Sequence, residues 1–465
     1  MWKIACFLLL FISFTSSAQT NKLLIEAVTV EGNKKTKTQI ILRELDFRVG
    51  DTLRLSEIGP ALERNRRLIL NTGLFTIVQM NVIRWDEATK RISIHIKVQE
   101  TWYIFPIPIF ELADRNFNVW WSEMNRDLER VNFGVRAYHL NITGRQDLLK
   151  LAAQYGYTQK YELEYSLPSI NRSQTLGIWT NLFYSRNREI FVNTIDNKLI
   201  FERSDRDFLL RRRRLGGGLR YRPGLYFYHQ ISLRYFHNSV KETFAPELNP
   251  DYFLNDRSEQ HFFTLKYDFS IDKRDIRPYP LQGYYLLAEL QKIGLGFFDD
   301  RDALIFTGTL AQYLPVSKKF NLELIAKGQL LLSRNQQPYY NSRALGFEPD
   351  FLRGYELYVI DGQDFGFLKS SLRYELLNKI LNFEEAMPIK QLKLMPLRIY
   401  LSWNVDLGYV RDGYYQKNNP LSNRLLYSTG LGLDIISYYN RVFQIQFTFN
   451  HLKEKGLYLH HKFIF

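Results

Sequence analysis

The feature that most constrains this chain is a two-residue alternation of apolar and polar side chains that runs from Trp102 to its end. Because successive side chains of a strand point to opposite faces, each alternating segment is predicted to be a strand with one apolar and one polar face. Similar segments run over Ile399–Val410 and Phe263–Arg274. The clearest lies at 442–450, where Phe443, Ile445, Phe447 and Phe449 alternate with Gln444, Gln446, Thr448 and Asn450.

Two observations favour a membrane-spanning barrel over a soluble sandwich. The apolar faces are rich in aromatic residues, of which the chain has 30 Tyr, 34 Phe and 7 Trp, while the opposite faces carry mixed charge. Beyond the N-terminus, no apolar run approaches the ~18 residues of a membrane helix. We therefore predict an all-β transmembrane barrel over residues 101–465, since its lipid face needs only every second residue to be apolar.

Sixteen alternating segments can be counted, which predicts sixteen antiparallel strands. Short connections such as 143–145 and 318–319 alternate with long ones at 186–205, 241–260 and 334–362. An even strand number with this asymmetry is typical of a barrel with short periplasmic turns and longer surface loops. The segments start near residues 103, 131, 147, 160, 175, 208, 228, 261, 284, 303, 320, 366, 397, 425, 441 and 457.

The first eighteen residues are typical of a secretory signal peptide. Basic Lys3 precedes an apolar run from Ile4 to Phe14 and the small residues Ser16-Ser17-Ala18, so cleavage is expected after Ala18. The single cysteine, Cys6, lies inside this segment. The mature chain is therefore expected to form neither a disulfide nor a thiolate metal site.

Residues 22–100 are predicted to form a separate β-α-α-β-β domain, with Thr36 and Gln39 as a capping box for its first helix. With Val30-Glu31-Gly32-Asn33 after the first strand and Asn71-Thr72-Gly73-Leu74-Phe75 after the second helix, this order resembles a POTRA domain. The resemblance implies a periplasmic domain that accepts extended chains by strand addition to an exposed sheet edge. A small α+β domain with no special role is the alternative.

Four short motifs in the barrel resemble the BamA and TamA superfamily of outer-membrane assembly factors, which includes the two-partner secretion transporters. The strand-end motif contains Asp272, Arg274, Asp275, Pro280 and Gly283, and the loop motif is Leu352-Arg353-Gly354-Tyr355. Arg373-Tyr374-Glu375 and Asp406-Leu407-Gly408 complete the set. The terminal Phe463 and Phe465 resemble the signal that outer-membrane barrels present to their assembly machinery.

Strand parity gives Arg353 a predicted partner. Asp406 and Glu375 both fall on the polar faces of their strands, which would line the lumen. A long loop folded into the lumen could bring Arg353 to Asp406, which is the contact that the resemblance implies, with Glu375 as a second lumen group. The glycine after Arg353 lets the backbone pass closely while the guanidinium binds a carboxylate. The alternative is a solvated loop tip.

Pro106 and Pro108, two residues apart, lack N–H groups that would point to the same neighbour. Proline is tolerated mainly at sheet edges, so we predict that this first strand faces the last one across a weak seam. The alternative places both prolines in the linker before the barrel.

The formal charge of +14 could indicate nucleic acid, but export removes that partner. Anionic outer-membrane lipid, including lipopolysaccharide, is the expected counter-charge, and the run Arg211–Arg214 could bind its phosphates or else line a solvated rim or the lumen. No Gly-x-Ser-x-Gly, His-Glu-x-x-His or phosphate loop is present, and His460-His461 point to opposite faces. We expect no enzyme activity, metal or cofactor.

The resemblance implies a factor in the cell outer membrane, with its POTRA domain in the periplasm, that inserts or translocates unfolded outer-membrane or secreted proteins. The single POTRA domain departs from the several usual in the housekeeping factor. That leaves open an accessory role with partner lipoproteins, or an exporter of one dedicated secreted protein through the lumen. A passive porin is the third alternative.

Overall fold

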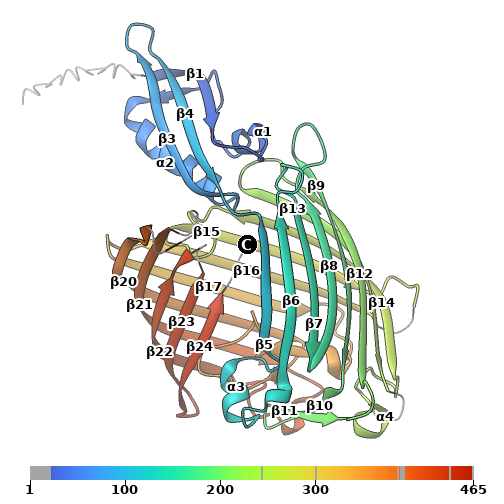
Figure 1. Ribbon diagram of the computed structural model, residues 1–465. Coiled ribbons are helices and arrows are strands. Elements are labelled where there is room, and N and C mark those ends of the chain that lie inside the picture. The colour runs from blue at the N-terminus through green and yellow to red at the C-terminus, as the bar shows by residue number, and fades with distance from the viewer. Residues whose placement is uncertain are drawn as a thin grey trace, which may run out of the picture.

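The chain forms a small N-terminal domain that stands on one rim of a sixteen-stranded barrel (Figure 1). The computed structural model describes residues 22–241, 245–298, 301–384, 387, 393–438 and 441–462. The expected signal peptide and the terminal Phe463 and Phe465 lie outside the described residues. We call the barrel end beside the N-terminal domain the proximal rim and the opposite end the distal rim.

The N-terminal domain is a four-stranded sheet in the order β2-β1-β4-β3, with β1 parallel to β4. The two predicted helices and three predicted strands are present, and a short strand, β2, was missed. The apolar residues of β4 and of helix α2 pack into one core. The elements are β1 (Lys22–Glu31), α1 (Thr38–Leu42), β2 (Thr52–Arg54), a 3-10 turn (Leu55–Glu57), α2 (Ile58–Leu70), β3 (Phe75–Asp86) and β4 (Arg91–Glu100).

The predicted capping box of the first helix is wrong. The helix begins at Thr38, and its N-cap residue, Lys37, makes no side-chain capping bond. Thr36 is instead buried against the barrel, where its hydroxyl contacts the hydroxyl of Tyr103 at 2.9 Å and accepts a bond from the Asn141 amide at 2.9 Å. A tertiary contact has therefore replaced the local one that the sequence suggested.

The barrel has the predicted sixteen antiparallel strands, and every start lies within three residues of its predicted position. Inward side chains are polar and outward ones apolar: in β23, Gln444, Gln446 and Thr448 are buried while Phe443 and Phe447 are exposed. The strands are β5 (Ile104–Leu112), β6 (Val131–Leu140), β7 (Leu148–Gly156), β8 (Thr158–Leu167), β9 (Leu176–Asn187), β12 (Leu210–Tyr221), β13 (Phe227–Val240), β14 (Glu259–Asp272), β15 (Gly283–Ile293), β16 (Ala303–Pro315), β17 (Phe320–Leu331), β20 (Asp364–Asn382), β21 (Leu394–Arg411), β22 (Leu425–Ile436), β23 (Val442–Asn450) and β24 (Lys455–Lys462).

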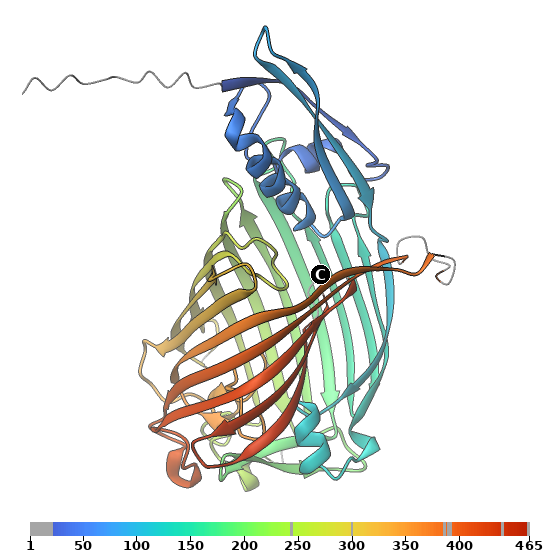
Figure 2. The same cartoon turned by 90° about the vertical axis from the view of Figure 1, so that its left-hand side faces the viewer.

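Connections at the distal rim carry elements that the alternation did not predict. Helix α3 (Phe117–Ser122) follows β5, and the hairpin β10 (Glu189–Ile195) and β11 (Lys198–Arg203) follows β9. Strands β18 (Arg343–Leu345) and β19 (Ile360–Asp361) lie in the loop before β20, and α4 (Ala245–Leu248) follows β13. At the proximal rim, β20 and β21 extend beyond their neighbours as a hairpin that projects sideways from the barrel (Figure 2).

In the described part of the chain, no helix is both long and apolar enough to cross a membrane.

The sheet has two ends, β5 and β24. Each is hydrogen-bonded to one neighbour, β6 and β23 respectively, and over the described residues the two strands do not pair with each other. We call the junction between them the seam.

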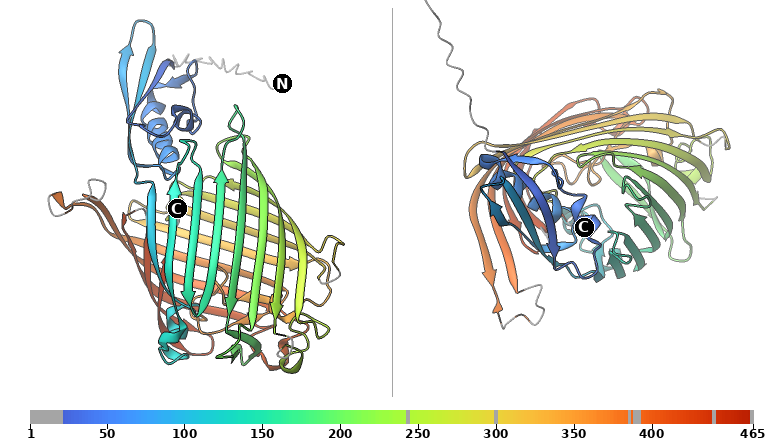
Figure 3. Two further views of the ribbon diagram at one scale, coloured as in Figure 1. Left: turned by 45° about the vertical axis from the view of Figure 1, so that its right-hand side comes forward. Right: turned by 90° about the horizontal axis from the view of Figure 1, so that it is seen from above.

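The N-terminal domain is fixed to proximal turns of the β6–β15 half of the barrel, and from above it lies over one side of the mouth (Figure 3). Arg222, after β12, donates two bonds to Glu44, from Nη1 at 2.6 Å and Nη2 at 2.7 Å. Glu44 is only 4% exposed. The Asn71 amide donates to the carbonyl of Asp275 in the turn after β14 at 3.0 Å.

Acidification is expected to loosen this attachment. Burial opposes ionisation of Glu44, but bonds and charge from Arg222 and Arg43 outweigh it and hold the pKa of Glu44 below its ordinary 4.5. Because the pKa of Glu44 is lower in the folded protein, the Glu44–Arg222 pair stabilises the docked domain fully at pH values above 4.5. This stabilisation is lost as the pH falls through the lowered pKa. The measurement is energy transfer between dyes at Thr89→Cys, on the exposed β3–β4 turn, and Lys318→Cys, on the opposite proximal rim. Transfer should change below pH 4.5.

In Glu44→Gln the same change should already be present at neutral pH. Glu57→Gln, on the exposed turn before α2, is the matched control. Identical transfer in Glu44→Gln and the parent protein at every pH would contradict the prediction.

Candidate functional site

The loop between β17 and β20 folds back into the barrel and is held there by its central residues. Leu345, Leu352 and Tyr355 are each at most 2% exposed, although they belong to a connection between strands. They pack with inward residues of β20, β21 and β22 in one apolar cluster. We call residues 343–362 the lumen loop.

Arg353 is the centre of the lumen loop's polar contacts. Its Nε lies 2.9 and 3.0 Å from the two carboxylate oxygens of Asp406, and its backbone N–H donates to Oδ2 at 3.0 Å. Nη1 donates to Ser371 Oγ at 2.8 Å and to Asn404 Oδ1 at 2.5 Å. Arg353 is 7% exposed and Asp406 1%. The solvated loop tip considered above is therefore not what the chain forms.

The glycines of the two motifs make this close approach possible. Gly354 has φ +83°, a conformation that L side chains rarely adopt, and its carbonyl accepts a bond from the Asn450 amide at 2.8 Å. A Cβ on Gly408 would lie 2.5 Å from Leu352 Cδ1. Gly408 lies two residues after Asp406, on the same face of β21. Its lack of a side chain leaves room for Leu352, the residue that precedes Arg353.

The lumen loop contacts both sides of the seam. On the β24 side, the Glu356 carboxylate lies 3.3 Å from His460 Nε2. On the β5 side, Arg115 donates to the carbonyls of Gly346 and Tyr358, each at 2.8 Å, and Asn116 donates to the carbonyl of Glu356 at 2.7 Å.

Helix α3 crosses the seam directly at the distal rim. The Asn118 amide donates to the backbone carbonyl of Leu457 in β24 at 2.5 Å. That carbonyl points away from β23 and would belong to a ladder if the seam were paired. A side chain therefore takes the place of a backbone donor at this point.

Pro106 and Pro108 lie within β5, not in a linker before it. Leu140 N donates to the carbonyl of Tyr103, and Ala113 N donates to that of Arg130, so odd-numbered residues of β5 direct their backbone groups toward β6. Even-numbered residues then face the seam, because backbone direction alternates along a strand. The two prolines remove two donors from the edge that would pair with β24.

The strand-end motif builds the turn that the N-terminal domain contacts. Asp272 accepts bonds from Arg274 at 2.8 Å, and Asp275 Oδ1 accepts from three backbone N–H groups of the same turn. The carbonyl of Pro280 accepts from Arg373 at 3.1 Å, which draws the turn into the lumen. Gly283 has φ +102°, where a Cβ would lie 2.0 Å from the Lys273 carbonyl.

Glu375 does not join Arg353. Its carboxylate accepts from the hydroxyl of Tyr400 at 3.0 Å, near the proximal end of β20. The strand has an irregularity between Glu375 and Leu377, so Glu375 lies where the regular lumen face ends. Tyr279, which sequence reasoning missed, fills the lumen nearby: it donates to Asp434 at 2.7 Å beneath the Arg373 guanidinium.

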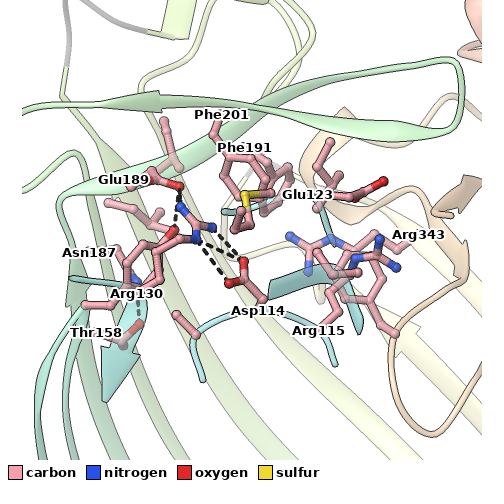
Figure 4. Close-up of a pocket in the computed structure, with 18 of the residues that line it drawn as sticks. Asp114, Arg115, Glu123, Arg130, Thr158, Asn187, Glu189, Phe191, Phe201 and Arg343 are labelled. Atoms are coloured by element: carbon pink, nitrogen blue, oxygen red, sulfur yellow. Dashed lines mark hydrogen bonds and ion pairs between the residues drawn. The ribbon is translucent and has the colours of Figure 1, made fainter. Parts of the chain in front are cut away.

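The distal connections close over a cavity of about 190 Å³ (Figure 4). Arg130 lies at its wall and forms ion pairs with Asp114 and Glu189. The tip of the β10–β11 hairpin is tied to the lumen loop, because Val359 N donates to the Asn197 carbonyl at 2.8 Å. Connections after β5, β9 and β17 therefore obstruct the distal mouth together. In the described part of the chain, no three His, Cys, Asp or Glu side chains are placed to hold a metal.

Two family descriptions match the chain. "Omp85 superfamily domain" matches residues 141–455, and "Surface antigen variable number repeat", the POTRA family, matches residues 23–101. No curated protein matches the sequence.

Two of the solved structures that resemble the chain show the shared fold. CdiB from Escherichia coli aligns with a TM-score of 0.55 at 12% identity, over 94% of this chain and 75% of that one. BamA from Haemophilus ducreyi lacking POTRA domains 1-3 aligns with a TM-score of 0.51 at 14% identity, over 94% of this chain and 84% of that one.

Proposed function

Since the chain belongs to the Omp85 superfamily, we propose that it resides in the outer membrane with its POTRA domain in the periplasm and inserts or translocates unfolded polypeptides. The observation that carries the proposal is the seam. Sixteen strands form one wall, yet over the described residues its two edges are joined by side chains and the lumen loop, with no backbone ladder. Side-chain contacts can be exchanged for a client strand at low cost.

In the proposed mechanism, the POTRA domain receives an extended client through a sheet edge, and the edge of β5 then offers the client a pairing template. The seam opens laterally while Arg353 and Asp406 keep the lumen loop in place. Client strand pairing and burial in lipid supply the free energy, so no nucleotide, cofactor or covalent step is required. Lipopolysaccharide and accessory lipoproteins are the further partners proposed.

The test is reconstitution into phosphatidylcholine vesicles free of glycolipid. Urea-denatured outer-membrane barrels are diluted in, and folded client is measured by protection from protease. We expect faster client folding than in empty vesicles and low ion conductance, since the distal connections obstruct the lumen. Appreciable conductance without faster client folding would support the exporter or the porin instead and would sink the insertion proposal.

Restoring the missing donors at the seam is expected to slow insertion. Pro106→Val with Pro108→Val adds two N–H groups that face β24, and each bond is worth about 0.5–1.5 kcal/mol. A seam held by about 1–3 kcal/mol more should open roughly five to 150 times less often. The readout is the client folding rate in the same vesicles. Pro315→Val, at the end of β16, is the control, and equal rates for seam variant and control would count against a gate at β5.

A further inference from the structure

The basic run in β12 is divided between the two faces of the barrel wall. Arg212 points inward, where it donates to Ser185 at 2.9 Å and to Asn187 at 2.9 Å. Arg211 and Arg213 point outward and are exposed. Neither has a hydrogen bond or an ion pair among the residues that the structure describes. Two exposed guanidinium groups on an outward barrel face are thus available to bind an anion from outside the chain.

The outward neighbours of these arginines add to the positive charge. Arg211 lies directly opposite Arg186 of β9, and like charges directly opposite each other destabilise a sheet. Arg213 lies between Tyr184 of β9 and His237 of β13. Among the described residues, two carboxylates lie near this group, and each already has a partner of its own. His237 contacts Glu259 at 3.2 Å, and Asp207, which interacts electrostatically with Arg211, forms an ion pair with Lys241 at 2.5 Å. Among the described residues, Arg186 donates its side-chain hydrogen bond to a neutral group, Gln159, at 2.8 Å.

The depth of the group in the wall indicates the source of the anion. Arg211 and Arg213 lie at the distal end of β12, and the next outward residues toward the proximal rim include Leu215 and Leu219, both exposed. Outward aromatic rings cluster beside Arg213 and Leu215, which is the pattern of the girdle that marks the membrane interface in such barrels. They include Tyr155, Tyr161, Tyr184, Tyr235 and Phe263. The arginines thus lie at headgroup depth on the distal side.

We propose that Arg186, Arg211 and Arg213 form a binding site for the phosphate of a phosphorylated lipid headgroup in the distal leaflet. Phosphate oxygens accept the paired N–H groups of a guanidinium bidentately, and a dianion would remove the repulsion between Arg186 and Arg211. The inference rests on the membrane placement proposed above and goes beyond client insertion, because it assigns a lipid site to the outer wall.

The test is thermal unfolding of the purified full chain in a neutral maltoside detergent, titrated with diphosphorylated lipid A. The matched control ligands are the same lipid with its phosphates removed and inorganic phosphate. We expect saturable stabilisation by the phosphorylated lipid alone. Equal stabilisation by dephosphorylated lipid, or by inorganic phosphate at the same concentration, would overturn the proposal.

Arg211→Gln with Arg213→Gln should weaken lipid binding about 100-fold, since each charge-assisted bond is worth about 1.5–3 kcal/mol. Lys292→Gln is the matched control, because this distal cation of β15 is already paired with Asp302, and its affinity should equal that of the parent. Unchanged affinity in the double variant would refute the site. If the double variant does not fold, Arg213→Gln alone carries the test, with about a tenfold loss expected. Because the insertion assay contains no glycolipid, failure here would leave the insertion proposal standing.

Discussion

Replacing Asp406 with asparagine is expected to destabilise the barrel by about 3–5 kcal/mol, the usual consequence of leaving one partner of a buried ion pair without its counter-charge. Arg353 would remain inside the lumen with only neutral acceptors, Asn404, Ser370 and Ser371. Arg353→Ala should cost a similar amount, because Asp406 would then be the unpaired charge. Equilibrium unfolding in guanidinium, followed by tryptophan fluorescence in phospholipid vesicles, gives the free energy of unfolding.

Insertion activity should fall with stability, because the lumen loop would no longer be fixed relative to β24. Asp434→Asn is the control: Asp434 is equally buried in the lumen, but its direct bonds come from the neutral Tyr279 and Gln444. Arg353→Lys should retain part of the stability, because lysine keeps the positive charge. It should lose the rest, because an ammonium group cannot bind the carboxylate through two nitrogens as the guanidinium does. A free energy of unfolding for Asp406→Asn equal to that of Asp434→Asn would show that the ion pair does not hold the loop.

Joining the two edges of the seam is expected to abolish insertion completely and reversibly. Asn118→Cys and Leu457→Cys place thiols on residues that contact each other across the seam, and the only native cysteine, Cys6, lies in the expected signal peptide. A short cleavable bismaleimide should reduce client folding to the rate of empty vesicles, because no client strand could enter between β5 and β24. Cleaving the linker should restore the original rate.

The control for chemical modification is Leu151→Cys with Leu163→Cys, which face each other across the ladder between β7 and β8. Crosslinking there joins strands that are already paired, so the insertion rate should not change. Full activity with the seam joined would mean that clients do not pass between β5 and β24.

The barrel was predictable because a strand's side-chain period is two, so a polar face can be followed along the chain without any knowledge of its neighbours. The same parity placed Asp406 in the lumen, and the resemblance named Arg353 as its partner. Glu375 shows the limit of that reasoning. The pairing register of β20 shifts between Glu375 and Leu377, and the alternation of apolar and polar residues over 364–382 did not predict this shift.

The attachment of the N-terminal domain was not predictable for a different reason. Glu44 and Arg222 are 178 residues apart, and each stands in a short polar segment that would be unremarkable at a surface. Thr36 was misassigned because a local capping pattern and a distant hydrogen-bond partner use the same hydroxyl. The connections at the distal rim do not continue the two-residue alternation of the barrel strands. The sequence pattern therefore did not predict α3 or the β10–β11 hairpin.

The attachment of the N-terminal domain to one half of the barrel divides the molecule mechanically. Hydrogen bonds and an ion pair attach the domain to turns of the β6–β15 half. Similar bonds attach the Arg353 end of the lumen loop to strands β20–β24. Opening the seam would therefore move the two halves apart about the wall between β15 and β20, which becomes the hinge. The bonds from Arg115, Asn116 and Asn197 to the lumen loop would have to break first. A client bound to the N-terminal domain would move together with β5. The distance between the domain and the β5 edge that pairs with the client would therefore stay constant while the seam opens.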